Sequence, residues 1–213
     1  PAVGYAPWSG VFVRKGARAV AQDSVFDKAE ESNEAILANL RPSAVDQIIS
    51  QKTNDDVSKG FCTPRMCRKD MEDLLEGKRY RLIRRFAIQQ GDKHRLIDDA
   101  AVSGQSDSSS DANQLRFCSA LQPARHIRAL AAACSAADSS RIQNVGIMSG
   151  GEDWPDAYRY TPMEPADALG CVVVYLHPDG EPAFHIYHGL LFGLPLAVTS
   201  FNRFSKLAEA MVR

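Results

Sequence analysis

The sequence has few cysteines, no long apolar run and almost no net charge, and each of these features excludes a class of protein. The five cysteines, at positions 62, 67, 118, 134 and 171, form no C-x-x-C pair and are odd in number. That pattern argues against a disulfide framework or a zinc knuckle and fits a reducing compartment. The longest apolar run, 169–176, falls short of the roughly 18 residues of a membrane span, and no signal peptide is visible. We therefore expect an intracellular protein, cytoplasmic or nuclear, that does not contact a membrane.

The formal net charge of −1 neither requires nor excludes a nucleic-acid partner, but the basic residues are unevenly distributed. Seven lysines and arginines lie between Lys78 and Arg95, against the single acid Asp92. A local patch of this kind can hold phosphates even when the whole chain is neutral. A solvated strand edge explains the same pattern, and charge alone does not separate the two interpretations.

Hydrophobic periodicity and turn residues predict an α+β fold. The expected helices cover 24–58 (divided by Pro42), Thr63-Pro64 to Leu75, 112–138 (interrupted at Pro123) and 195–213. The expected strands are 80–90 and 93–99, which form a hairpin around Gly91-Asp92, followed by 142–148, 169–176 and 184–187. We expect the last three strands to form a small antiparallel sheet with flanking helices, and the Ala-rich half of 112–138 to pack against a sheet.

The first candidate site is the segment Asp153-Trp154-Pro155-Asp156-Ala157-Tyr158, which follows an expected strand. A carboxylate at the end of a strand can hold Mg²⁺ together with waters and a substrate phosphate, the usual arrangement for that hard cation. The second acid and the tyrosine then lie on the turn beyond the metal. Polar turns between strands are common, so the segment taken alone is explained more readily as an ordinary turn.

Two further segments could take part in such a site. In the segment 190–195 (LLFGLP), Gly193 lets a backbone or a ligand approach closely, and Pro195 marks the start of a helix whose free N–H groups suit an anion or a base edge. On the hairpin, Arg95 could grip a phosphate through two nitrogens. A surface salt bridge with Asp92 or Asp99 would explain Arg95 as well.

Taken together, the three segments resemble the fingers hairpin, the first carboxylate segment and the following Gly-bearing segment of reverse transcriptases, especially those of retrotransposons. The family's hairpin has an apolar triplet, a Gly/Asp turn and Lys-x-Arg followed by two apolar residues and Asp, and 86–98 (FAIQQGDKHRLID) resembles it. The segment 153–158 resembles Asp-x-x-Asp-Ala-Tyr, and 190–201 (LLFGLPLAVTSF) resembles Leu-x-Phe-Gly-Leu followed by small residues and Phe. The resemblance covers about 80–213 and does not extend to 1–79.

The resemblance implies the fingers and an incomplete palm of a right-hand polymerase. The implied regions are an N-terminal irregular and helical extension (1–60), a fingers-like region with the basic hairpin (61–138) and a partial palm (139–213). An enzyme of this family uses Mg²⁺ or Mn²⁺, an RNA or DNA template–primer and deoxynucleoside triphosphates. Its reaction is template-directed nucleotidyl transfer, an RNA-directed DNA polymerase activity.

The resemblance also implies a role for each matching residue. Asp153 would be the catalytic carboxylate and would bind the metal ions that activate the primer hydroxyl and steady the leaving pyrophosphate. The implied substrate-binding residues are Arg95, on the triphosphate oxygens; Asp156 and Ala157, through their backbone N–H groups; Tyr158, as the steric gate against a ribose 2′-hydroxyl; and Phe192 and Gly193, along the nucleotide pocket.

The sequence departs from the family at three places. The second carboxylate segment, an aromatic residue followed by any residue and Asp-Asp, is absent from the 213 residues, so we expect these residues alone not to polymerise. Gln89 and Gln90 stand where many relatives carry a lysine, and Pro155 lies inside the metal turn. These departures leave open a non-catalytic nucleic-acid-binding remnant of a retroelement, or an α+β interaction domain in which every motif is structural.

Two other chemistries find less support in the sequence. A different metal-dependent phosphoryl-transfer enzyme would need a second acidic cluster, and Asp98-Asp99 is the nearest pair. A zinc site would need ligands beyond His185 and His188, which lie on or beside a strand and are better explained as core or surface residues.

Overall fold

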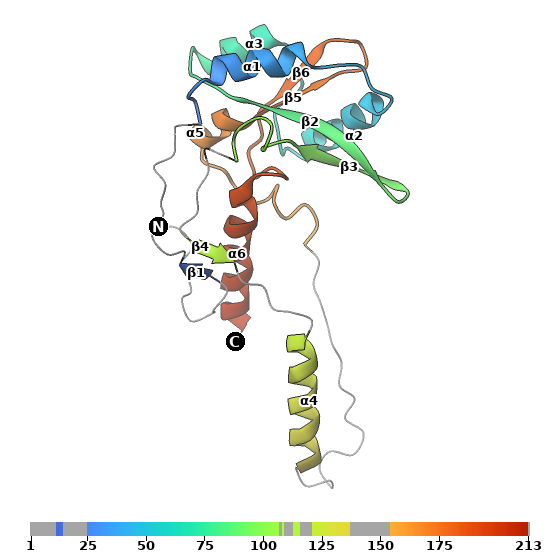
Figure 1. Cartoon of the computed structure of the whole chain (residues 1–213), viewed down its shortest axis with the longest axis vertical. Helices are drawn as coiled ribbons and strands as arrows, with labels where there is room; N and C mark the ends of the chain where they lie inside the picture. The colour runs from blue at the N-terminus through green and yellow to red at the C-terminus, as the bar shows by residue number, and fades with distance from the viewer. Residues whose placement is uncertain are drawn as a thin grey trace.

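The structure, a computed structural model, describes residues 12–14, 25–106, 108, 113–115, 121–136 and 154–212 (Figure 1). The helices are α1 (Ala29–Ala38), α2 (Asp46–Ser58), α3 (Arg68–Leu75), α4 (Leu121–Ala136), α5 (Pro165–Ala168) and α6 (Pro195–Val212), with a 3₁₀ turn over Leu169–Cys171. The strands are β1 (Phe12–Arg14), β2 (Leu82–Gln90), β3 (Lys93–Asp98), β4 (Asn113–Leu115), β5 (Val172–Leu176) and β6 (Pro182–His185). The chain is α+β, as predicted.

Four strands form the main sheet in the order β3-β2-β5-β6. The β5–β6 pair is antiparallel, as expected. The β2–β5 pair is parallel, with Leu82 opposite Val172, so the sheet is mixed and not purely antiparallel as we expected. Parallel neighbours require a long crossover, and the chain between β3 and β5 is long enough to provide one. Strands from the 61–138 region and from the 139–213 region therefore share one sheet.

The hairpin formed by β2 and β3 confirms the prediction for this segment. Its antiparallel register runs from Arg85 opposite Asp98 to Gln90 opposite Lys93. Gly91 has a φ of 58°, the left-handed conformation that a tight two-residue turn requires at this position. The hairpin thus projects from the sheet with a turn whose conformation is set by glycine.

Alternation along the strands gives the sheet two apolar faces. On one face, α1 and α3 cover Leu82, Val172 and Val174. On the other face, α2 covers Tyr175 and Ala183. Figure 1 shows α1 and α3 beside each other above the sheet, with α2 on a different side. β5 is buried from both sides, in agreement with its continuous apolar sequence.

Helix α3 begins later than the sequence predicts. Its N-cap is Cys67, whose sulfur accepts a hydrogen bond from the Asp70 N–H (3.4 Å). Thr63 is used elsewhere: its hydroxyl accepts the Ile186 N–H (3.0 Å) and its own N–H donates to the Ile186 carbonyl (2.9 Å). The predicted end at Leu75 is confirmed, because the next residue, Glu76, adopts the left-handed conformation.

The region 112–138 also differs from the prediction of one interrupted helix. β4 pairs with β1 in a separate two-stranded antiparallel ladder, and α4 begins only at Leu121. Pro123 therefore falls in the first turn of α4, where a helix tolerates proline, and it causes no interruption. The described side chains of α4 are almost all exposed and the helix lies apart from the sheet (Figure 1), so the expected packing against a sheet is wrong for these residues.

The predicted strand over 142–148 lies outside the described residues. The last predicted helix is confirmed as α6. Among the helices of the described ranges, none has the length and apolar character needed to cross a membrane.

Candidate functional site

A buried ion pair joins the two strands of the hairpin. The Arg85 guanidinium donates to both carboxylate oxygens of Asp98, from Nε to Oδ1 (2.7 Å) and from Nη2 to Oδ2 (3.0 Å). The two side chains are 0% and 1% exposed. Two charges buried this deeply are tolerated only when they are paired and hydrogen-bonded. The Arg85–Asp98 pair therefore holds β2 and β3 together at the end of β3.

Tyr187 extends this pair toward α2. Its hydroxyl accepts a hydrogen bond from Arg85 Nη1 (2.5 Å) and donates one to Asp56 Oδ2 (2.8 Å). Its ring lies between two guanidinium groups, with centroid distances of 4.7 Å to Arg85 and 4.3 Å to Arg159. Burial raises the pKa of Tyr187 above its usual value, so the hydroxyl stays protonated and able to donate.

Arg159 completes the network and connects it to the first candidate segment, since it directly follows Tyr158. Its guanidinium lies 3.6 Å from a carboxylate oxygen of Asp98 and 3.6 Å from one of Asp56. It also donates to the backbone carbonyl of Leu190 (3.2 Å), just before the Gly-bearing segment. Two arginines and two aspartates thus hold four parts of the chain together; we call Asp56, Arg85, Asp98, Arg159 and Tyr187 the buried charge network.

The turn over 155–160 presents backbone donors. Asp156 has a φ of 54°, a conformation that Asp adopts more readily than most residues. Its carbonyl accepts the N–H groups of Arg159 (2.8 Å) and Tyr160 (3.2 Å), which closes the turn. Within the described part of the chain, nothing accepts a hydrogen bond from the N–H groups of Asp156, Ala157 or Tyr158. Adjacent N–H groups without acceptors are suited to binding an anion.

Aromatic rings lie next to these donors. The Tyr158 ring meets Phe192 edge-on at 4.8 Å and Phe201 at 5.5 Å between centroids. Trp154 meets Phe201 in the same manner at 5.7 Å. Phe192 remains 48% exposed, so the group of rings is open on one side. Edge-to-face geometry is the usual preference of aromatic pairs, and here it brings the first candidate segment into contact with the Gly-bearing segment and α6.

The Gly193 backbone lies so close to the end of β3 that a side chain at this position would clash. Its φ is 105°, and an added Cβ would lie 2.1 Å from the Asp98 carbonyl oxygen. A separation below about 3 Å cannot be accommodated without moving one of the backbones. The sequence predicted that Gly193 allows a close approach, and the partner is the backbone of Asp98.

The structure therefore brings together most of the predicted substrate-binding residues. Tyr158 contacts Phe192 through its ring, Arg159, which follows it, donates to the Leu190 carbonyl, and Gly193 lies against the Asp98 backbone. Asp156 and Ala157 lie on the same turn as Tyr158. Asp153, the predicted catalytic and metal-binding residue, lies outside the described residues.

Arg95 is the predicted site residue that the structure does not connect to the others. It is exposed, and within the described ranges its guanidinium forms no hydrogen bond or ion pair. Arg95 and Asp98 are three positions apart on β3, and alternation places their side chains on opposite faces of the sheet. Asp99, one of its two expected salt-bridge partners, is instead bound by Arg84 Nη2 (3.1 Å).

More than half of the cationic side chains between Lys78 and Arg95 form hydrogen bonds within the protein. Internal acceptors bind four of its seven cationic side chains, those of Arg79, Arg81, Arg84 and Arg85. Such side chains are not available to phosphates unless they give up these partners. The charge pattern from Lys78 to Arg95 is therefore partly structural, which neither of the two interpretations from the sequence anticipated.

The described carboxylates do not form a metal centre. In the ranges that the structure describes, no group of three or more His, Cys, Asp or Glu side chains is arranged to hold an ion. Asp98 is bound by Arg85, Asp99 by Arg84 and Asp156 by Lys59, at 2.6 Å in the last case. Asp98 and Asp99, the pair that another phosphoryl-transfer enzyme could use, are thus each bound by an arginine.

The two histidines are explained without a metal. His185 is buried on β6, where its Nδ1 lies 2.9 Å from the Thr63 carbonyl and its ring stacks on Tyr175 with a centroid distance of 5.8 Å. Burial lowers the pKa of His185 to about 4, so the ring is neutral at physiological pH. His188 is exposed.

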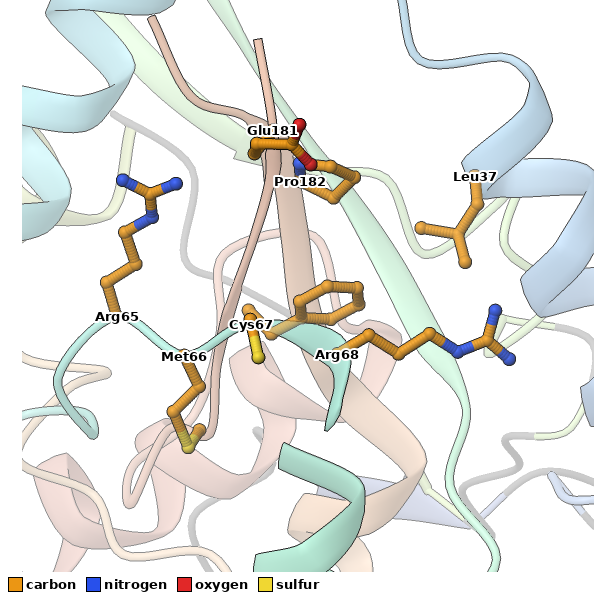
Figure 2. Close-up of a pocket in the computed structure, with 8 residues that line it drawn as sticks. Leu37, Arg65, Met66, Cys67, Arg68, Glu181 and Pro182 are labelled. Carbon is orange, nitrogen blue, oxygen red and sulfur yellow. The ribbon is translucent and has the colours of Figure 1, made fainter. Parts of the chain in front are cut away.

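A cavity of about 550 Å³ lies on the α1–α3 side of the sheet, on the face opposite the buried charge network. Figure 2 shows Arg65 and Arg68 extending from its wall in different directions, with Cys67 between them. Both arginines already have acidic partners, Asp179 for Arg65 and the glutamates 34 and 72 for Arg68. The cavity lies on the other face of the sheet and is not part of the candidate site.

Sequence reasoning missed several residues of the site. Asp56, Lys59, Arg159 and Tyr187 reach it from α2, from the turn and from the chain beyond β6. Only Arg159 carried a signal, as the residue adjacent to the candidate segment. The other contacts are long-range and depend on how α2 packs on the sheet.

No protein-family model matches the chain, and no curated protein matches it significantly. Function is therefore argued from the geometry of the site.

Proposed function

We propose that the chain is part of a reverse transcriptase, comprising its fingers and part of its palm, and that it binds a deoxynucleoside triphosphate beside the turn 155–160. The observation that supports this is the convergence of three segments that are far apart in the sequence. The end of the hairpin, the turn and the Gly-bearing segment meet at Asp98, through Arg159 and Gly193. A nucleotide pocket of this enzyme class requires these three segments together.

Each element of the proposed pocket has a physical counterpart. The N–H groups of Asp156 and Ala157 would donate to triphosphate oxygens, which the absence of acceptors among the described residues permits. The Tyr158 ring, held between Phe192 and Phe201, would exclude a 2′-hydroxyl by its bulk. Phe192, half exposed, would offer its ring to the sugar or base.

Arg95 and Asp153 are part of the same proposal. Arg95 is exposed and has no internal partner in the described ranges, so it is available to a phosphate that reaches its side of the hairpin. Asp153 would hold Mg²⁺ or Mn²⁺, which would neutralise charge on the triphosphate. The template–primer would lie along the hairpin side of the pocket.

Nucleotide selectivity tests the proposal. The affinities of the chain for dGTP and GTP, which differ only in the 2′-hydroxyl, are measured by equilibrium dialysis with a primer–template and Mg²⁺. We expect dGTP to bind about tenfold more tightly, because a steric clash of this kind typically discriminates by about one to three kcal/mol. Tyr158→Ala should admit GTP and bring the ratio close to one.

The matched control is Tyr160→Ala, which removes a 71% exposed tyrosine two positions away and should keep the preference for dGTP. Circular dichroism establishes that both variants fold. Equal binding of dGTP and GTP to the unaltered chain would contradict the proposal. Binding of the primer–template without either nucleotide would favour the nucleic-acid-binding remnant, and binding of neither would favour an interaction domain.

A further inference from the structure

Lys59 reaches the candidate site from outside the part of the chain that resembles the polymerase family. It forms the C-cap of α2, and its Nζ lies 2.6 Å from Asp156 Oδ2. The Lys59 and Asp156 side chains are 49% and 37% exposed, so the contact is open to solvent. The Lys59 ammonium also lies 5.7 Å from the centre of the Phe61 ring.

Through Asp156, Lys59 lies close to the backbone N–H donors of the turn. The carboxylate that binds Lys59 belongs to the residue whose N–H begins the row of three donors without acceptors among the described residues. An anion bound by those donors would therefore lie within reach of a flexible lysine side chain. A cation and adjacent N–H groups at one place form the kind of site that proteins use for phosphates.

The other cations near the turn are less suited to this role. Arg159 is buried and lies between two carboxylates, those of Asp56 and Asp98. Arg95 is on the opposite face of the sheet from Asp98, and Gln89 and Gln90 on the hairpin are uncharged. Lys59 is thus an exposed cation that contacts the turn directly.

We propose that Lys59 is a phosphate-binding residue of this site and that a triphosphate displaces the Asp156 carboxylate from it. The inference rests on the nucleotide-binding function proposed above and adds a residue to it. Exchange is feasible because an exposed ion pair contributes little free energy, whereas a hydrogen bond from an ammonium to a phosphate is strong. Lys59 is a surface lysine at the end of a helix, so a change of partner requires only a rotation of its side chain.

The test compares dGTP with deoxyguanosine, which lacks the phosphates, in equilibrium dialysis with primer–template and Mg²⁺ at fixed ionic strength. We expect Lys59→Gln to weaken dGTP binding about tenfold, the effect of one hydrogen bond to a charged group, and to leave deoxyguanosine binding unchanged. Lys52→Gln is the matched control, because Lys52 is exposed on the same helix and should bind dGTP like the unaltered chain.

Asp156→Asn separates phosphate binding from a structural role of the ion pair. Asparagine tolerates the left-handed backbone of this position and no longer competes for Lys59, so dGTP should bind about threefold more tightly, the effect of releasing one exposed ion pair. If the ion pair only stabilised the fold, Asp156→Asn and Lys59→Gln would weaken binding alike, and the inference would be overturned.

The remaining outcomes distinguish a failure of this inference from a failure of the proposed function. Unchanged dGTP binding by Lys59→Gln would overturn the role of Lys59 and leave the proposed nucleotide site intact. An equal loss of deoxyguanosine binding would show that Lys59 acts through the fold. Failure of the unaltered chain to bind dGTP would overturn the proposed function, and with it this inference.

Discussion

At the scale of single residues, Gly193 is a position where the site has no room for a side chain. Its φ of 105° and the 2.1 Å separation between an added Cβ and the Asp98 carbonyl oxygen are two separate obstacles to a side chain. We expect Gly193→Ala to lower the free energy of unfolding by about 2 kcal/mol or more, since a residue strained in this region costs about 1 to 3 kcal/mol before any clash. Urea denaturation measures the change.

Gly180→Ala provides the control for this prediction. Gly180 has a similar φ of 93°, but an added Cβ would have nothing within 4 Å. The difference between the two variants therefore isolates the clash with Asp98. If Gly193→Ala were no more destabilising than Gly180→Ala, the close approach of the Gly-bearing segment to β3 would be contradicted.

Some residues of the candidate site could be predicted from the sequence and others could not. Gly193 was predictable because a glycine shortly before a helix start usually marks a tight turn or a close backbone approach. Tyr158 and Phe192 were predictable only through the family resemblance. Lys59 and Tyr187 were not predictable, because a lone lysine after a helix and a tyrosine after a strand are common, and their roles arise from contacts between segments far apart in the sequence.

At the scale of secondary-structure elements, the buried charge network decides how the hairpin, α2 and the turn are held together. Asp98 accepts two hydrogen bonds from Arg85 and lies close to Arg159, so its charge balances two buried guanidinium groups. We expect Asp98→Asn to destabilise the fold by about 3 to 5 kcal/mol, the cost of leaving a buried charge without its partner. Denaturant unfolding measures this loss.

The adjacent residue provides a matched comparison. Asp99 pairs with Arg84, whose side chain is 38% exposed, and it also accepts the Val102 N–H (3.1 Å). Asp99→Asn keeps an acceptor for that N–H and breaks only a partly exposed ion pair, so we expect a loss of about 1 kcal/mol or less. Similar effects of the two substitutions would be evidence against a buried network at Asp98.

Strands and helices with a clear pattern in the local sequence were predicted correctly. Features that depend on contacts between distant segments were predicted wrongly. The hairpin, β5 and α6 follow from alternation, an apolar run and helical periodicity. The parallel pairing of β2 with β5 has no local signal, because it depends on the path of the chain between them. The start of α3 was misplaced because Thr63 binds the backbone next to β6, an interaction that a local capping rule does not anticipate.

At the scale of the whole molecule, the described residues 25–60 pack on the same sheet as the rest of the described chain. α2 covers one face of the sheet and α1 covers part of the other. α2 also brings Asp56 into the buried charge network, and Lys59 at its end contacts the turn. α2, which lies outside the resemblance to the polymerase family, therefore contributes to the candidate site, and sequence motifs alone could not show this.

Global stability should depend on pH through His185, because burial lowers its pKa to about 4 from the usual 6.5. Between these values the unfolded chain binds a proton that the folded chain does not. Stability is therefore greatest above about pH 6.5 and falls by about 3 kcal/mol as the pH drops to about 4, by the linkage of pKa to unfolding.

The measurement is the free energy of unfolding of the unaltered chain and of His185→Gln between about pH 4 and 7. The variant loses the stacking on Tyr175 and should be less stable at neutral pH, but it lacks the titrating ring. Its stability should therefore decline less on acidification, so that the two curves converge at the acidic end. His188→Gln, which changes an exposed histidine three positions along the chain, should follow the unaltered curve. Parallel curves for His185→Gln and the unaltered chain would mean that His185 titrates normally and is not buried as the structure describes.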